Sequence, residues 1–144
     1  ARRMPVLIST RICMSSGGNG SPARGGMRTL DVETESAVRR FLTLLTGRYD
    51  MAGAIVYGSR ARGTHQPDSD ADVAVLLNGE TQRALPTTLA MADVAYDVLL
   101  ETGINISPLP VWMDQWEHPE RFSNPDLLRT IALEGIRLVQ QGAT

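Results

Sequence analysis

The sequence contains no lysine, a single cysteine and few aromatic residues, which make up 5% of the chain. All 14 basic residues are arginines and 16 residues are acidic, so the net charge of -2 does not indicate a nucleic-acid partner. Cys13 alone cannot form an intrachain disulfide, and neither cysteine nor histidine recurs at zinc-ligand spacing. No apolar run is long enough to span a bilayer. We therefore predict a protein of a reducing, cytoplasmic compartment without membrane association or a zinc site.

The length of 144 residues accommodates one domain with a hydrophobic core and is too short for two of ordinary size. Residues 1–30 carry five arginines and no acidic residue, and residues 15–22 are rich in glycine and serine. Because such a stretch buries little apolar surface, we predict a disordered tail or an N-terminal extension, with an organelle transit peptide as an alternative. The folded domain is predicted over residues 31–144.

Two helices and two strands are predicted in the first half of this domain. A first helix is expected from Asp31 to a glycine cap at Gly47, because apolar residues recur at positions i, i+3, i+4 and i+7. The short β-branched run of residues 51–57 predicts a buried strand, followed by a short helix that begins at Ser59. A second strand is predicted over residues 70–77. The apolar residues of the first helix are Val38, Phe41, Leu42 and Leu45.

The second half predicts two helices and an edge strand. Residues 87–101 are typical of a solvated amphipathic helix that ends at Gly103. Residues 104–112 predict a third strand, and its two prolines place it at an edge of the sheet. Asn124 is expected to cap a last helix that has Pro125 at its first position. The apolar side of that helix is predicted to comprise Leu127, Leu128, Ile131, Leu138 and Val139.

A motif suited to phosphate chemistry joins the first two predicted strands. It consists of Gly58-Ser59, ten further residues, and Asp70-Ala71-Asp72. Glycine lets a phosphate approach the backbone, and a helix that starts at Ser59 offers unpaired amides. Carboxylates two residues apart on a strand point the same way, and magnesium prefers oxygen ligands. The motif therefore predicts a site for a metal-bound nucleoside triphosphate, with Asp70 and Asp72 as the metal ligands.

Two arginines follow the glycine and serine of this motif. Arg60 and Arg62 are candidates for contacts with the triphosphate, because guanidinium groups bind phosphate oxygens in pairs. The alternative is a structural ion pair with the neighbouring aspartates. Two divalent ions about 4 Å apart would neutralise the triphosphate and hold the attacking and leaving oxygens in line. We therefore predict nucleotidyl transfer with magnesium as cofactor and ATP as substrate.

The motif resembles the signature of the minimal nucleotidyltransferases, which belong to the DNA polymerase beta superfamily. The Ala61-Arg62-Gly63 extension and the closing Glu134-Gly135-Ile136 are also similar to that family, and the resemblance covers about residues 31–140. It implies an α+β fold in which a small mixed β-sheet has helices packed on one side. It further implies that Asp70 and Asp72 bind magnesium and that Ser59 holds the nucleotide's phosphates.

The third predicted strand departs from the family pattern. The superfamily often places a third carboxylate there, which shares a metal and helps to deprotonate the attacking hydroxyl, whereas this chain has Asn105. A neutral amide cannot act as a base, so we predict a catalytic site of Asp70, Asp72 and Asn105 with weakened turnover. In a different strand register, Glu101 or Asp114 would supply the third carboxylate.

Many small members of the resembled family act as antitoxins, which silence a partner HEPN-domain RNase toxin by adenylylating one of its tyrosines. Our first hypothesis is therefore a nucleotidyltransferase that moves AMP from ATP to an acceptor hydroxyl, with a HEPN-type toxin as partner. The second is a catalytically weakened module that neutralises a toxin by contact alone. A third is a nucleotidyltransferase that acts on a small molecule or RNA.

Overall fold

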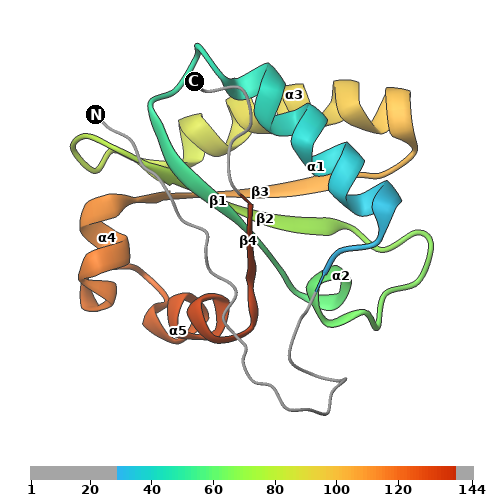
Figure 1. Cartoon of the computed structure of the whole chain (residues 1–144). Helices are drawn as coiled ribbons and strands as arrows, with labels where there is room; N and C mark the ends of the chain where they lie inside the picture. The colour runs from blue at the N-terminus through green and yellow to red at the C-terminus, as the bar shows by residue number, and fades with distance from the viewer. Residues whose placement is uncertain (1–28, 139–144) are drawn as a thin grey trace.

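A four-stranded mixed β-sheet is the frame of the computed structural model, which describes residues 29–138 (Figure 1). The strand order is β3-β2-β1-β4. β1 runs antiparallel to both β2 and β4, whereas β2 and β3 are parallel. The α+β class and the mixed sheet are therefore as predicted. The strands are β1 (Met51–Tyr57), β2 (Ala71–Leu77), β3 (Ile106–Trp112) and β4 (Ile136–Leu138).

Helices cover both faces of this sheet. The long helices α1 (Val32–Leu45) and α3 (Ala84–Thr102) lie on one face (Figure 1). On the other face lie α4 (Met113–Glu117), which the sequence pattern did not predict, and α5 (Pro125–Glu134). The prediction of helices on one side only is therefore wrong. The second layer forms because the sheet has apolar residues on both faces, and these need cover on both sides.

Side-chain alternation along β2 divides the core into two clusters. Val73, Val75 and Leu77 face α1 and α3, whereas Ala74 and Leu76 face α5. The cluster beneath the long helices is the larger one, and the cluster beneath α5 also contains residues from β1 and β3. Because both faces are buried, β2 is apolar at every position after Asp72.

Gly103 is the C-terminal cap of α3, as predicted, whereas the cap of α1 is Thr46 and the predicted Gly47 follows it in a turn. Gly47 and Gly103 follow α1 and α3 with positive φ angles of 93° and 81°, a conformation that glycine adopts without steric cost. At the start of α1, the side chain of Asp31 accepts a hydrogen bond from the Thr34 backbone N–H at 3.2 Å. These local signals explain why both helix boundaries could be predicted from sequence.

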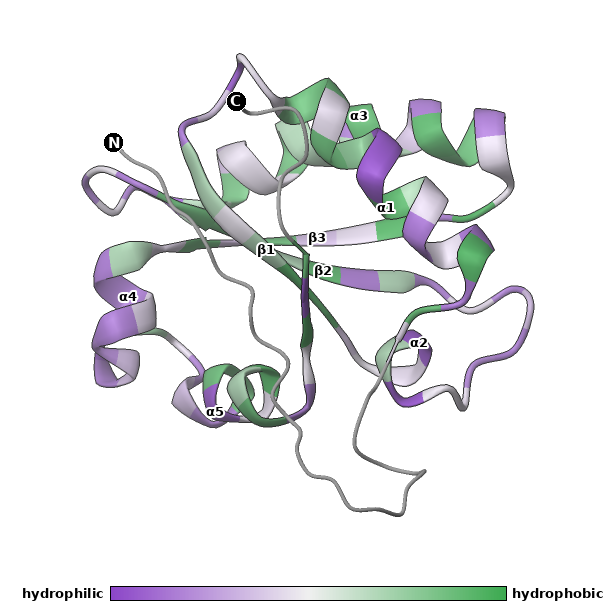
Figure 2. Cartoon of the chain, viewed as in Figure 1, coloured by the Kyte–Doolittle hydropathy of each residue, from purple (hydrophilic) through white to green (hydrophobic). Residues whose placement is uncertain are grey.

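The surface of α3 differs from the solvated amphipathic face that we predicted. The helix is longer than expected, and several large apolar side chains lie exposed on its outer side. Figure 2 shows hydrophobic segments along its length. Nevertheless, no helix within residues 29–138 combines the length and the apolar character that crossing a membrane requires.

β3 is an edge strand, as its prolines predict. It pairs with β2 alone, and the Asn105 carbonyl oxygen accepts a hydrogen bond from the Ala71 N–H at 2.9 Å. Alternate residues of a strand turn their backbone groups to opposite sides. The odd-numbered residues of β3 therefore bond to β2, and Pro108 and Pro110 turn their missing N–H groups to the open edge.

The last helix ends earlier than predicted. Asn124 caps α5 with its side chain, but the helix stops at Glu134 and the chain continues as β4 along β1. Leu138 was predicted on the helix and is instead buried in this strand. Val139, predicted with it, lies outside the described residues. Pairing of β4 with β1 accounts for the burial of Leu138.

Gly135 makes the tight turn from α5 into β4 possible. A Cβ atom at this position would collide with the Ile55 side chain and with the Ile131 carbonyl oxygen, and would lie 3.3 Å from the Val56 carbonyl oxygen. Two of these neighbours are backbone atoms, which cannot rotate away. The glycine therefore lets the end of α5 pack directly on β1.

We expect Gly135→Ala to lower the free energy of unfolding by about 1 to 3 kcal/mol, because it overpacks this junction. Gly53→Ala is the matched control, since the nearest atoms to its new Cβ lie 3.9 Å away. Urea denaturation of both variants measures the difference. A Gly135→Ala protein as stable as Gly53→Ala would contradict the close packing described here.

Candidate active site

Gly58 connects the end of β1 to α2 (Ser59–Arg62) and is the tightest point of the candidate site. Its φ angle of 80° lies in the region that side chains disfavour. A Cβ atom there would also collide with the Asp72 carboxylate, whose Cγ would lie at 3.4 Å. The glycine is thus required for its conformation and for the room that it leaves to Asp72.

Asp70 and Asp72 share one face of β2, as the alternation of the strand predicts. Asp70 immediately precedes the strand and is exposed, whereas Asp72 lies within it and is half-buried. Ala71 between them points into the core beneath α1 and α3. Asp72 pairs in register with Tyr57 on β1 and with Ser107 on β3. The two carboxylates therefore stand together on the face opposite the long helices.

The surroundings of Asp72 disfavour its negative charge. Burial raises the pKa of its carboxyl above the ordinary value, and the nearby Asp70 raises it further, while Arg62 partly opposes the shift. Burial, and then the charge of Asp72, raise the pKa of the neighbouring Tyr57 to about 12. The site consequently combines two clustered carboxylates with a shortage of positive charge.

The register of β3 places Asn105 beside Asp70. Asp72 pairs with Ser107, and the residues before them, Ala71 and Ile106, are also partners, so Asn105 follows next to Asp70 on the same face. No group of three or more histidine, cysteine, aspartate or glutamate side chains within residues 29–138 is arranged to hold a metal ion.

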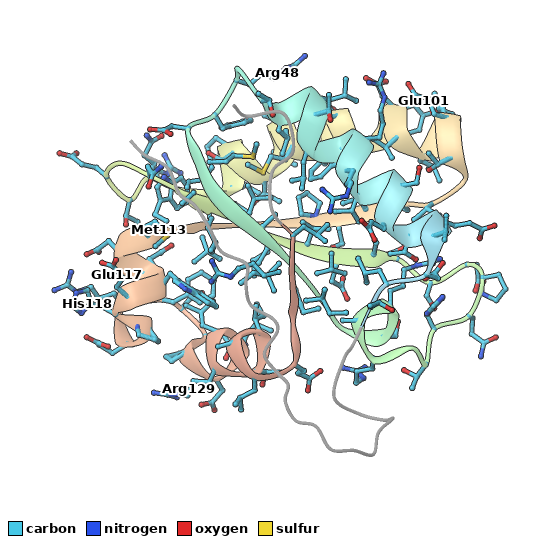
Figure 3. The ribbon with its side chains drawn as sticks, viewed as in Figure 1. Arg48, Glu101, Met113, Glu117, His118 and Arg129 are labelled. Carbon is cyan, nitrogen blue, oxygen red and sulfur yellow. The ribbon has the colours of Figure 1, made fainter. Side chains whose placement is uncertain are left out.

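The two alternative carboxylates are committed elsewhere. Glu101 lies on α3, in the layer opposite the site, where it accepts hydrogen bonds from Arg40 at 2.9 and 3.3 Å (Figure 3). Asp114 belongs to α4 and pairs with Arg121 at 2.5 Å. Neither lies beside Asp70, because Glu101 is in the opposite layer and Asp114 follows the far end of β3 from Asn105.

Arg60 is a structural residue, which favours neither the candidate contact with the triphosphate nor the ion pair with the aspartates. Its side chain is buried, with 4% of the residue exposed. Its guanidinium donates to the carbonyl oxygens of Ser69 and Pro67 at 2.9 and 3.0 Å and to the Thr34 hydroxyl at 2.8 Å. Because these acceptors belong to the loop before β2 and to α1, Arg60 holds that loop against the first helix.

His65 fastens the same loop at a second point. Its Nε2 lies 3.6 Å from a carboxylate oxygen of Asp31, the residue that caps α1. Burial alone would raise the pKa of Asp31, but hydrogen bonds from Thr34 and the charge of His65 outweigh it and lower that pKa. The loop that delivers Asp70 to the site is therefore anchored to the start of α1.

Arg62, by contrast, is exposed and lies near the carboxylates. Its Nη1 donates to Glu134 at the end of α5 at 2.9 Å, and its charge lowers the pKa of Asp72. This arginine therefore remains a candidate contact for a phosphate, together with Ser59 at the start of α2. Sequence reasoning did not assign Tyr57 or Ser107 to the site, because only strand register brings them to Asp72.

A sequence model described as a nucleotidyltransferase domain matches residues 38–137, a span that contains every one of these site residues. The chain belongs to this nucleotidyltransferase domain family. The match begins within α1 and ends within β4, so it covers β1, β2, β3 and the loop that precedes the two carboxylates.

Three individual proteins are similar to the chain. A "putative protein adenylyltransferase" of Methanocaldococcus jannaschii is 34% identical over 62 residues, a stretch that covers 43% of this chain and 42% of that relative. The chain thus matches less than half the length of this relative. A "putative nucleotidyltransferase" structure from Sulfolobus solfataricus superposes with a TM-score of 0.51 at 12% identity, and covers 78% of this chain and 85% of that one. This superposition supports the fold.

The third is a mutant of the toxin-antitoxin complex MntA-HpeT. One of its chains superposes with a TM-score of 0.49 at 17% identity, and the match covers 75% of this chain and 73% of that one.

Asp72→Asn should raise the melting temperature of the metal-free protein at pH 7. Folding raises the pKa of the Asp72 carboxyl. This group therefore stabilises the fold at a pH below its pKa in the unfolded chain, and that contribution is lost as the pH rises through its pKa in the folded protein. The difference from the wild type should therefore shrink toward pH 4. Thermal melts with a chelator measure it, with the exposed loop variant Asp68→Asn as control. A lower melting temperature for Asp72→Asn at pH 7 would disprove the unfavourable charge.

The two arginines of α2 should differ in their effect on stability. Arg60→Met removes the donor from the buried Thr34 hydroxyl and from the partly buried carbonyl oxygens of Ser69 and Pro67, so it should cost about 2 kcal/mol or more in the free energy of unfolding. Arg62→Met removes only an exposed ion pair and should cost less than about 1 kcal/mol. Chemical denaturation compares them, and equal losses would refute the separate roles of the two residues.

Proposed function

We propose that the chain is a magnesium-dependent nucleotidyltransferase that moves AMP from ATP to an acceptor hydroxyl. The observation that carries this proposal is the half-buried Asp72 carboxylate, which lies beside Asp70 and over Gly58. Two clustered carboxylates at the start of a strand, next to a glycine turn and a helix start, suit a metal-bound triphosphate. Membership of the nucleotidyltransferase domain family supports the reaction class.

The residues present fit a magnesium ion. Both carboxylates offer hard oxygen ligands, and their mutual repulsion would be relieved by a divalent cation. Asp70 and Asp72 would hold the ion, which when bound would neutralise charge on the triphosphate. The described residues supply two carboxylate ligands for this ion, and oxygens of the triphosphate are suited to be the remaining ligands.

In the proposed reaction, the acceptor oxygen forms a bond to the α-phosphorus of ATP. The bond from that phosphorus to the oxygen that bridges the α- and β-phosphates breaks, pyrophosphate leaves, and the acceptor hydroxyl loses its proton. Gly58 leaves space at the start of α2, and Ser59 is placed to hold a phosphate oxygen. Arg62 is exposed near Asp72 and can offer its charge to the triphosphate.

The site lacks a side chain suited to accept the proton of the attacking hydroxyl. Asn105 lies where a third carboxylate would assist, and an amide cannot take up the proton. We infer that the proton passes to solvent and that turnover is slow. This feature also favours a second candidate function, in which the chain neutralises a partner by contact without transferring AMP.

For the acceptor, we propose a tyrosine hydroxyl of a HEPN-type toxin, with this chain as its antitoxin. The resemblance of the Gly58 to Asp72 motif to minimal nucleotidyltransferases supports this role. The relative from Methanocaldococcus jannaschii is named as a "putative protein adenylyltransferase", which supports a protein as the acceptor. A small-molecule or RNA acceptor remains the alternative to be tested beside it.

The decisive test incubates the chain and magnesium with ATP labelled on its α-phosphate, and in parallel with ATP labelled on its γ-phosphate. The acceptor is a HEPN-type protein from the same genome, with the tyrosine proposed as its acceptor intact or changed to phenylalanine. We expect transfer of the α-label only, at least about 100-fold slower with Asp70→Asn or Asp72→Asn. Asn105→Asp should accelerate transfer, because it restores a proton acceptor and a metal ligand.

The controls separate the competing functions. Label on the toxin that persists with Asp72→Asn would disprove the metal site. Toxin that is inhibited in a stable complex without receiving label, from the wild type and from Asn105→Asp alike, would establish the binding module instead. Label that enters RNA or a small molecule, and never protein, would move the acceptor to those classes.

A further inference from the structure

The outer face of α3 carries a continuous apolar stripe. Its members are exposed to a similar degree, at 63%, 58%, 58% and 68% of their surface in chain order. At 100° per residue they lie within about 60° of one another around the helix axis, and they extend over about 22 Å. We call these residues the α3 stripe, and they are Leu85, Leu89, Tyr96 and Leu100.

This stripe is additional to the side of α3 that packs on the sheet. The buried side contains Met91, Val94, Ala95 and Val98, and it lies on the opposite side of the helix from the stripe. A helix that is apolar on both sides is normally buried on both sides. Exposed apolar surface arranged in a continuous line marks an interaction site more often than scattered residues do. The α3 stripe is therefore a candidate surface for binding a partner.

The charges beside the stripe indicate the chemistry of that partner. α3 contains three charged residues, Asp93, Asp97 and Glu101, and no basic one. Their spacing of four residues places them along one flank of the stripe. Glu101 is paired with Arg40 of α1, whereas Asp93 and Asp97 are exposed and make no ion pair within residues 29–138. An acidic flank beside an apolar stripe selects a partner with complementary positive charge.

A second copy of this chain does not supply that charge. If two α3 helices packed antiparallel about a two-fold axis, Asp93 and Asp97 of both copies would gather on the same side. If they packed parallel, the two carboxylates would face Ala92 and Leu99 of the other helix, which carry no charge. Self-association through the stripe therefore gives Asp93 and Asp97 no complementary charge in either arrangement.

We propose that the α3 stripe docks an amphipathic helix of a different protein, with apolar residues at i, i+4 and i+11 spacing and arginine or lysine along one flank. The apolar residues would cover the stripe, and the basic flank would pair with Asp93 and Asp97. This surface lies on the sheet face opposite Asp72, so an occupied stripe leaves the candidate active site open. The proposal goes beyond the proposed function and does not depend on AMP transfer.

The test uses three synthetic helical peptides with the whole chain. The first carries a leucine stripe with an arginine flank, the second replaces those arginines by glutamates, and the third has the composition of the first with the stripe scrambled. Fluorescence anisotropy of each labelled peptide measures its affinity at 0.1 M salt. We expect the first peptide to bind at least about tenfold more tightly than either of the others.

Variants of the chain locate the binding. Leu89→Gln with Leu100→Gln should weaken binding of the first peptide at least about tenfold. Val32→Gln with Leu133→Gln should not, because these two residues are even more exposed but lie outside the stripe. Asp93→Asn with Asp97→Asn should weaken binding and reduce its salt dependence. Melting temperatures verify that each variant folds, and unchanged ATP affinity separates this surface from the active site.

Three results would overturn the proposal. If the first peptide does not bind, or if all three bind equally, the α3 stripe and its acidic flank do not recognise a helix in the proposed way. Binding that survives Leu89→Gln with Leu100→Gln would place it elsewhere on the chain. Light scattering that shows a dimer for the wild type and a monomer for that double variant would identify a second copy as the occupant.

Discussion

The contact between the Asp72 carboxylate and Gly58 is the constraint on which the rest of the site depends. It brings the turn after β1 against the start of β2, so that a helix start and two carboxylates meet at one point. The contact requires a residue without a side chain at position 58. It also half-buries the negative charge of Asp72 next to that of Asp70, and this arrangement is unfavourable while no cation is bound. The protein therefore retains an electrostatic strain that a bound cation would relieve.

A second constraint is the position of the loop that carries Asp70. Arg60 and Arg62 are two residues apart on α2, and this spacing turns them to nearly opposite sides of the helix. Arg60 points inward and holds the loop through three hydrogen bonds, while Arg62 remains at the surface beside Asp72. The same residue type thus serves the structure at one position and remains available for a ligand at the other.

The sheet separates the two functional surfaces that we propose. The carboxylates lie on the face that α4 and α5 partly cover, whereas the α3 stripe lies outside the opposite helical layer. β2 contributes to both faces. Its even-numbered residues lie on the same face as Asp72, whereas its odd-numbered residues lie on the face that α3 covers. A partner bound along α3 would therefore not compete with a nucleotide bound at the carboxylates.

Much of the fold and of the site followed from local patterns. The bounds of β1, the start of α2 at Ser59 and the glycines after α1 and α3 are set by short-range steric and hydrogen-bonding preferences, which are legible in sequence. The spacing of Asp70 and Asp72 likewise placed them on one face, because strand alternation is a local property. The burial of Arg60 was not predictable, since its acceptors Thr34 and Pro67 meet only in the folded chain.

The sequence by itself determined the reaction class that the Gly58 to Asp72 motif indicates and the elements that carry it. Tertiary structure alone decided that Glu101 and Asp114 are paired away from the site, that Leu138 joins a strand, and that the outer side of α3 is apolar and uncovered. The physical reason is the same in each case. Propensity and periodicity act over a few neighbouring residues, whereas charge pairing, strand pairing and burial depend on segments that only folding brings together.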